Sequence, residues 1–170
     1  MTVSKLVVNV GVTAKENFGI DIFMSVNIML GNLKPHLWEM MADMVRFVAG
    51  ALEECGVPVK IGTSQLDEGA LNLFFDRFYI EPTFPNKMKI GHVKYGMVCT
   101  EVISSEGIWN YGAERDVPGT LSAFILAIKN AEFVWCLLEE SFEFCRSINP
   151  NTVVLPFGYL KKMESTRAIS

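Results

Sequence analysis

The chain has 170 residues and a net charge of −4 at pH 7, and half of its residues are hydrophobic. This length suits one domain with a full hydrophobic core, and this composition excludes disordered, coiled-coil and collagen-like proteins. The acidic balance argues against nucleic acid or an anionic membrane surface as the main partner.

Apolar runs and helical periodicity alternate along the chain. Residues 5–12 form a β-branched apolar run that predicts a first strand, and residues 21–30 form a second candidate strand. The clearest helix is predicted over residues 36–55, where apolar side chains recur at i, i+3, i+4 and i+7. Its predicted buried stripe consists of Leu37, Met40, Met41, Met44, Val48, Ala51, Leu52 and Cys55. Gly56 is expected to close this helix in the left-handed conformation.

The remaining elements continue this alternation. Strands are predicted over residues 57–61, 70–75, 95–103, 132–137 and 152–155, and helices over residues 118–131 and 138–148. Most of these strands are continuous apolar runs, as in a parallel sheet that is buried on both faces. We therefore expect an α/β fold with a Rossmann-like, doubly wound, mainly parallel sheet and helices on both faces. One such domain is expected over residues 1–159, and residues 160–170 are expected to form a polar tail or the start of an interdomain linker.

Several common catalytic and cofactor motifs are missing from the sequence. It contains no phosphate-binding P-loop, no glycine-rich dinucleotide fingerprint and no G-x-S-x-G nucleophile elbow. The two histidines, His36 and His92, lie far apart and have no companion ligand at metal-binding spacing. We therefore expect neither a cofactor nor a metal site.

The four cysteines have no C-x-x-C spacing, and each lies in an apolar run. They are Cys55, Cys99, Cys136 and Cys145. This pattern predicts reduced, buried thiols in a cytoplasmic protein. The longest uncharged run, residues 22–33, is too short to span a bilayer, so we expect no membrane span.

Ligands of open α/β sheets bind beyond the carboxyl ends of the strands. Thr13, Thr63, Thr100 and Glu101 follow predicted strands and are therefore candidate site residues. Glu101 comes directly after an apolar strand, where partial burial of a carboxylate favours general-base chemistry. The alternative is a structural role for Glu101, as a helix cap or as the ion-pair partner of Arg115.

Residues 104–118 form a polar segment that is too long and too aromatic for a simple connection. Trp109, Asn110, Tyr111 and Arg115 lie in it and are candidate substrate-binding residues. Aromatic faces beside an amide suit sugars and nucleobases. The alternative is that the aromatic side chains fold the segment down onto the core.

A series of short motifs resembles the N-terminal half of bacterial glycosyltransferase-like proteins of the GT-B architecture. A strand ending in Thr100 and Glu101 leads to a loop that carries Asn110, a strand with Val134 and Trp135 follows, and the run LPFGY closes the series at residues 155–159. The resemblance covers residues 60–159. It implies a Rossmann-like domain that holds the acceptor, facing a second domain that binds the nucleotide-sugar donor.

The chain stops shortly after the motif that leads into the second domain of such proteins. The resemblance therefore implies an acceptor-side domain that is not a complete transferase alone, with a sugar or nucleotide-sugar related ligand. A homo-oligomer or a missing C-terminal domain would complete it. The alternative is a non-enzymatic α/β small-molecule-binding or protein-interaction module that self-associates. A receiver-like domain is a weaker hypothesis, because Glu16 and Asp76 match its acidic cluster and phosphorylated Asp poorly.

Overall fold

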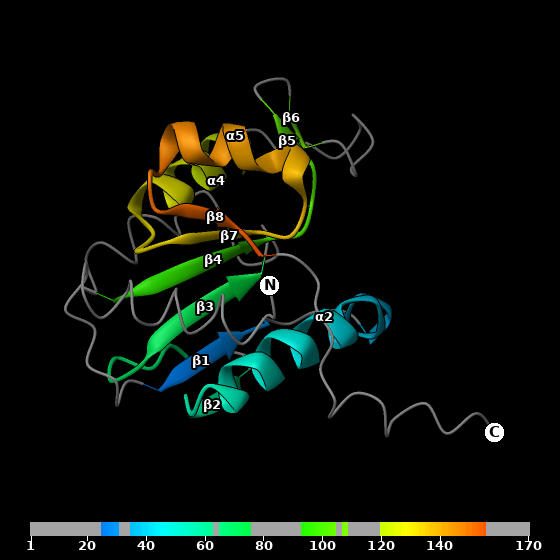
Figure 1. Ribbon diagram of the computed structural model, residues 1–170, viewed down its shortest axis with the longest axis vertical. Coiled ribbons are helices and arrows are strands. Elements are labelled where there is room, and N and C mark those ends of the chain that lie inside the picture. The colour runs from blue at the N-terminus through cyan, green and yellow to red at the C-terminus, as the bar shows by residue number, and fades with distance from the viewer. Residues whose placement is uncertain are drawn as a thin grey trace.

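The structure is a computed structural model that describes residues 25–30, 35–62, 65–75, 93–104, 107–108 and 120–155. The helices and strands of the described residues alternate along the chain (Figure 1). In chain order they are β1 (Val26–Met29), α2 (Pro35–Glu54), β2 (Val59–Gly62), β3 (Leu71–Phe75), β4 (Tyr95–Cys99), β5 (Ile103–Ser104), β6 (Gly107–Ile108), α4 (Thr120–Asn130), β7 (Val134–Cys136), α5 (Glu139–Ile148) and β8 (Thr152–Val154).

Six of these strands form one sheet in the order β2-β1-β3-β4-β7-β8, and every pair of neighbours is parallel. The chain moves outward from β1 to β2, returns to β3 on the other side of β1, and then moves outward through β8. In Figure 1, α4 and α5 lie together above β7 and β8, whereas α2 lies beside β1 and β2. This arrangement confirms the expected Rossmann-like, doubly wound parallel sheet.

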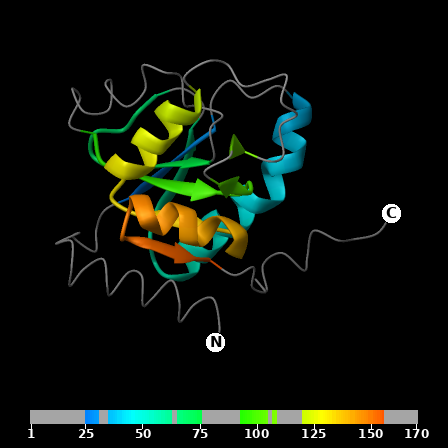
Figure 2. The same cartoon turned by 90° about the horizontal axis from the view of Figure 1, so that it is seen from above.

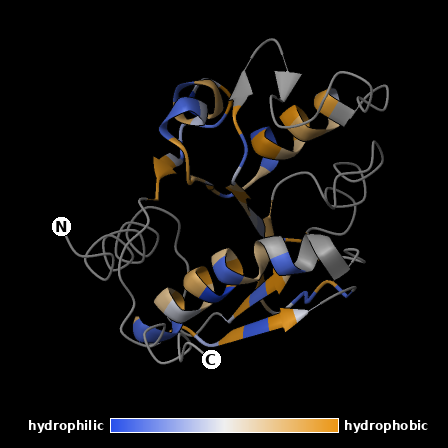
Figure 3. Ribbon diagram, turned by 90° about the vertical axis from the view of Figure 1, so that its right-hand side faces the viewer, coloured by the Kyte–Doolittle hydropathy of each residue, from blue (hydrophilic) through white to orange (hydrophobic). Residues whose placement is uncertain are grey.

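Both faces of the sheet are covered, which explains why its central strands are continuous apolar runs. All residues of β1, β3, β4 and β7 are buried. Alternate side chains point to opposite faces. Ile28, Leu73 and Trp135 contribute to the core formed with α2, whereas Met97 and Val134 contribute to the core formed with α4 and α5. In Figure 3 the strands are mostly hydrophobic, whereas α2 carries residues of both kinds.

Helix α2 covers the first of these faces. Of its predicted stripe, Met41, Val48, Ala51 and Leu52 are buried, and the same face also buries Val45. Its charged residues are exposed, namely Glu39, Asp43, Arg46, Glu53 and Glu54. The chain leaves the helix through Gly56, whose φ of 77° is the predicted left-handed conformation.

Two buried asparagines hold the irregular connection between β2 and β3. Asn27 donates hydrogen bonds to Asn72 Oδ1 (2.9 Å) and to the backbone oxygen of Gln65 (3.1 Å). Asn72 accepts a hydrogen bond from the backbone N–H of Asp67 and donates one to its backbone oxygen. Residues 65–70, the described part of this connection, form no helix or strand, so these amides supply partners for backbone groups that have none from regular secondary structure.

The main difference from the sequence-based expectation concerns β4, which was expected to continue to residue 103 and instead ends at Cys99. Cys99 is paired with Cys136, the last residue of β7, so on this side the sheet offers no partner for a longer strand. Residues 103–104 instead pair with residues 107–108 in the antiparallel β5–β6 hairpin, within the expected loop.

The other expected elements are confirmed to within a few residues, and β1 occupies the end of the segment expected at residues 21–30. The expected first strand at residues 5–12 lies outside the described residues. Whether residues 1–159 form one domain stays a prediction.

A substitution at Gly96 tests the packing of the sheet face that α2 covers. A Cβ atom added at Gly96 would overlap the ring of Phe133. We expect Gly96→Ala to lower the free energy of unfolding by about 1–3 kcal/mol, measured by chemical denaturation. The loss should be much smaller in a Phe133→Leu background. Gly69→Ala is the control, because its added Cβ would meet only Asp67 Oδ1, at 3.4 Å. An equal loss in both backgrounds would contradict this packing.

Replacing Asn72 tests whether its amide holds the β2–β3 connection. Asn72→Ala leaves both backbone groups of Asp67 without this partner, so we expect a loss of about 1–3 kcal/mol in the free energy of unfolding. Asn130→Ala is a matched control, because Asn130 is exposed and bonds only the Leu126 backbone oxygen of its own helix. Equal effects of the two substitutions would show that the buried amide has no special role.

Candidate functional site

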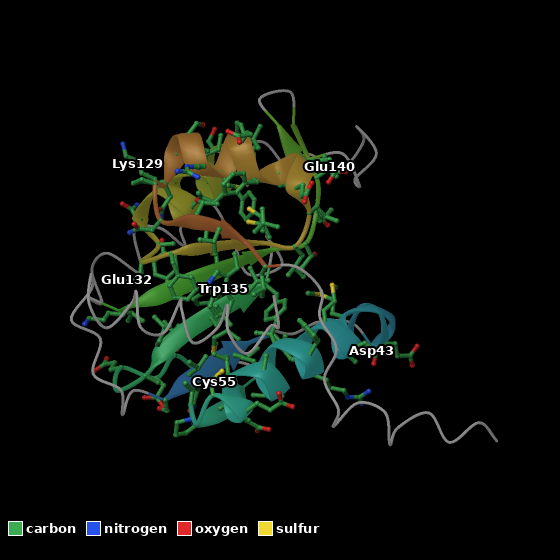
Figure 4. The ribbon with its side chains drawn as sticks, in the orientation of Figure 1. Asp43, Cys55, Lys129, Glu132, Trp135 and Glu140 are labelled. Atoms are coloured by element: carbon green, nitrogen blue, oxygen red, sulfur yellow. The ribbon has the colours of Figure 1, made fainter. Side chains whose placement is uncertain are left out.

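The carboxyl ends of the parallel strands meet at one edge of the sheet. The arrowheads of β1 and β3 in Figure 1 point toward this edge, and the β5–β6 hairpin lies on the same side. The first turn of α5, where Figure 4 labels Glu140, also lies there. The strand order reverses between β1 and β3, and β4 is the next strand along. Ligands of doubly wound sheets bind at this edge, near such a reversal.

Thr100 and Glu101 lie at this edge, directly after β4. Thr100 is half-buried, and Glu101 is only 8% exposed although it carries a carboxylate. Glutamate is rarely buried to this extent without a specific reason. Glu101 thus lies two residues beyond the end of β4, and its role in a site stays a prediction.

Helix α5 fixes the backbone around Glu101. The buried Ser141 hydroxyl donates a hydrogen bond of 2.6 Å to the backbone oxygen of Glu101. Two residues before α5 begins, the backbone N–H of Leu137 donates a hydrogen bond of 2.9 Å to the Cys99 backbone oxygen. These two contacts hold the segment after β4 against the start of α5. The backbone of Glu101 is thus positioned by both β4 and α5.

The described part of this edge carries negative charge. Glu139 and Glu140 form the exposed first turn of α5, next to Ser141, and this turn contains no basic residue. Acidic side chains suit a helix N-terminus, because they face the positive end of the helix dipole. The two exposed glutamates therefore make the first turn of α5 unfavourable for a phosphate.

The other sequence-predicted site residues lie outside the described residues. They are Thr13, Thr63, Trp109, Asn110, Tyr111 and Arg115. Their proximity to Glu101, and the alternative pairing of Glu101 with Arg115, stay predictions.

Three of the four cysteines form a cluster that the sequence analysis did not predict. The Sγ atoms of Cys99, Cys136 and Cys145 all lie within 4.8 Å of one another, and all three residues are fully buried. All four cysteines of the chain are free thiols, as expected, but Cys55 is half-buried rather than buried. Hydrogen bonds from Cys145 and Cys99 lower the pKa of the Cys136 thiol, against the burial that raises it. This is the one group of side chains among the described residues that could hold a metal ion.

Two other buried polar side chains on this face of the sheet, Tyr95 and Asn149, have structural partners. The Tyr95 hydroxyl donates a hydrogen bond of 2.7 Å to the Ala127 backbone oxygen, and burial, helped by Glu132, raises the pKa of Tyr95. Asn149 donates to the backbone oxygens of Ile128 and Ala131 at the end of α4. These contacts secure α4 and do not point to a ligand.

Comparison with known proteins gives no match to a protein family, to a curated protein or to a solved structure. None of the helices in the described ranges is long and apolar enough to cross a membrane.

Ser141→Ala tests the contact that holds the segment after β4. The substitution leaves the buried Glu101 backbone oxygen without its hydroxyl donor, so we expect a loss of about 1–3 kcal/mol in the free energy of unfolding. Ser147→Ala is the matched control in the same helix, because its hydroxyl bonds the Phe144 backbone oxygen at an exposed position. We expect a change of less than about 0.5 kcal/mol there. Similar losses in both variants would contradict the role assigned to Ser141.

Proposed function

We propose that the chain is the acceptor-side domain of a glycosyltransferase-like protein and binds a sugar-like ligand at the carboxyl edge of its sheet. The proposal combines the motif resemblance of residues 60–159 with the Rossmann-like parallel sheet formed by the described residues. The domain would supply the acceptor site, and a second domain or a partner would supply the donor. A cytoplasmic location belongs to the same proposal.

The observation that carries the proposal is the buried carboxylate residue at the end of β4. Glu101 is 8% exposed, and its backbone is bonded to α5 through Ser141. A carboxylate accepts hydrogen bonds from sugar hydroxyls, and one that is held in place can also remove a proton from an acceptor hydroxyl. We therefore assign Glu101 the role of ligand-binding residue and general base. Thr100 beside it would contribute a hydroxyl.

The charge at this edge favours the acceptor over the donor. Glu101, Glu139 and Glu140 would repel the diphosphate of a nucleotide sugar, whereas they leave a neutral sugar unaffected. A helix N-terminus often binds phosphate, but the two glutamates in the first turn of α5 disfavour that use here. The proposed ligand of the described edge is accordingly a neutral sugar.

The second candidate function is a non-enzymatic module that self-associates, and the edge strand β2 favours it. Among the described residues β2 pairs only with β1, and its Ile61 side chain is 48% exposed. Unpaired strand edges and exposed apolar side chains favour contacts with another chain. Two copies joined along β2 by a two-fold axis would be the simplest assembly. Dependence of the sedimentation coefficient on concentration, abolished by Ile61→Lys, would support this function.

Glu101→Gln tests the proposed sugar site, because it keeps the shape of the side chain and removes its charge. The probes are methyl hexosides, and their binding to the full chain is measured by saturation-transfer NMR. We expect at least one hexoside to bind, and we expect about a 10-fold weaker affinity in Glu101→Gln, which corresponds to about 1.4 kcal/mol. Glu140→Gln is the control, because it removes an exposed carboxylate from the same edge.

The thermal unfolding midpoint separates a ligand role from a structural one. The proposal predicts that Glu101→Gln keeps the midpoint of the unsubstituted chain and loses affinity. If Glu101→Gln lowers the thermal unfolding midpoint but the folded variant binds hexosides with unchanged affinity, Glu101 is a structural residue. Failure of every hexoside to bind the unsubstituted chain would reject the sugar site as a whole.

A further inference from the structure

The three buried thiols come from separate elements that meet at one point. Cys99 is the last residue of β4, Cys136 is the last residue of β7, and the two are register partners on adjacent strands. Cys145 lies in α5, which contacts β7 and covers this face of the sheet. The sheet register and the helix together therefore bring the three Sγ atoms within 4.8 Å of one another.

This spacing is close to that of a metal–thiolate centre. Metal–sulfur bonds of about 2.3 Å place the sulfurs of such a centre about 3.8–4.0 Å apart. The three Sγ atoms lie within 4.8 Å of one another, so small side-chain movements would let all three contact one ion.

Metal binding to this cluster would release thiol protons. The thiolate is the form of cysteine that binds metals. An ion entering the cluster would replace protons on the three sulfurs, and these protons would pass to the solvent.

We propose that Cys99, Cys136 and Cys145 form a three-sulfur site for a soft monovalent metal ion of the Cu(I) type. All three donors are sulfur, which favours soft ions over magnesium or calcium. Among the described residues no histidine or carboxylate joins the three sulfurs. Structural zinc sites use four ligands, whereas Cu(I) accepts three thiolates. The alternative is that the three thiols fill the core only as small apolar groups.

This site is independent of the proposed sugar site, although the two are neighbours. Cys99 precedes Thr100 and Glu101 by one and two residues, and α5 supplies both Cys145 and Ser141. A bound ion would tie β4, β7 and α5 together directly below the carboxyl edge. Metal binding would therefore rigidify the frame that positions Glu101 without contacting a ligand there.

Titration of the full chain with Cu(I) tests the proposal. The reduced protein is titrated without oxygen against a coloured Cu(I) chelator, and Zn²⁺ is titrated in parallel. We expect one copper per chain, a near-ultraviolet sulfur-to-copper absorption band, and three sulfur neighbours at about 2.3 Å in X-ray absorption. No copper binding, a sulfur count other than three, or Zn²⁺ displacing the copper at equal concentration would overturn the proposal.

Alanine substitutions assign the ligands and keep the core apolar. Cys99→Ala, Cys136→Ala and Cys145→Ala should each weaken Cu(I) binding at least 10-fold, with folding checked by circular dichroism. Cys55→Ala is the matched control, because Cys55 follows α2 and packs on the opposite face of the sheet (Figure 4). The assignment would be contradicted if any one of these three variants folded and kept its Cu(I) affinity, or if Cys55→Ala lost Cu(I) binding. If a variant does not fold, X-ray absorption on the unsubstituted chain still decides the sulfur count.

Discussion

The fold depends on one constraint, which is that a parallel sheet must be covered on both faces while every buried backbone group finds a partner. Strands β1, β3, β4 and β7 are buried throughout, and the helices lie over the two faces (Figure 2). The polar side chains inside this sheet mostly serve the backbone. Asn72 holds the β2–β3 connection, Asn149 secures the end of α4, and Ser141 holds the segment after β4.

The same constraint explains why the carboxyl edge is the natural place for a site. Pairing ends there, because β4 and β7 stop together at Cys99 and Cys136 and the chain turns away into the hairpin and α5. Side chains at this edge are held by the core below them, and Glu101 is buried there. Glu101 and the three-sulfur cluster both follow from this position, one at the edge and the other directly beneath it.

Much of the fold could be predicted from the sequence, because apolar runs and helical periodicity report burial directly. The limits of α2 and the glycine that closes it follow from local pattern alone. The end of β4 could not be predicted, because it depends on where the neighbouring strand stops. The cysteine cluster was missed for the same reason, since Cys99 and Cys136 are 37 positions apart in the sequence and only the sheet register brings them together. Glu101 was found because it directly follows an apolar run.

The most direct test of the central claim is a map of backbone amide chemical shifts on titration with the tightest-binding methyl hexoside. If the ligand site lies at the carboxyl edge above β4, the largest shifts will fall in residues 99–104 and 137–141, from the end of β4 and the start of α5. Largest shifts at the opposite edge of the sheet, in residues 65–70, 93–94 and 131–133, would contradict the claim.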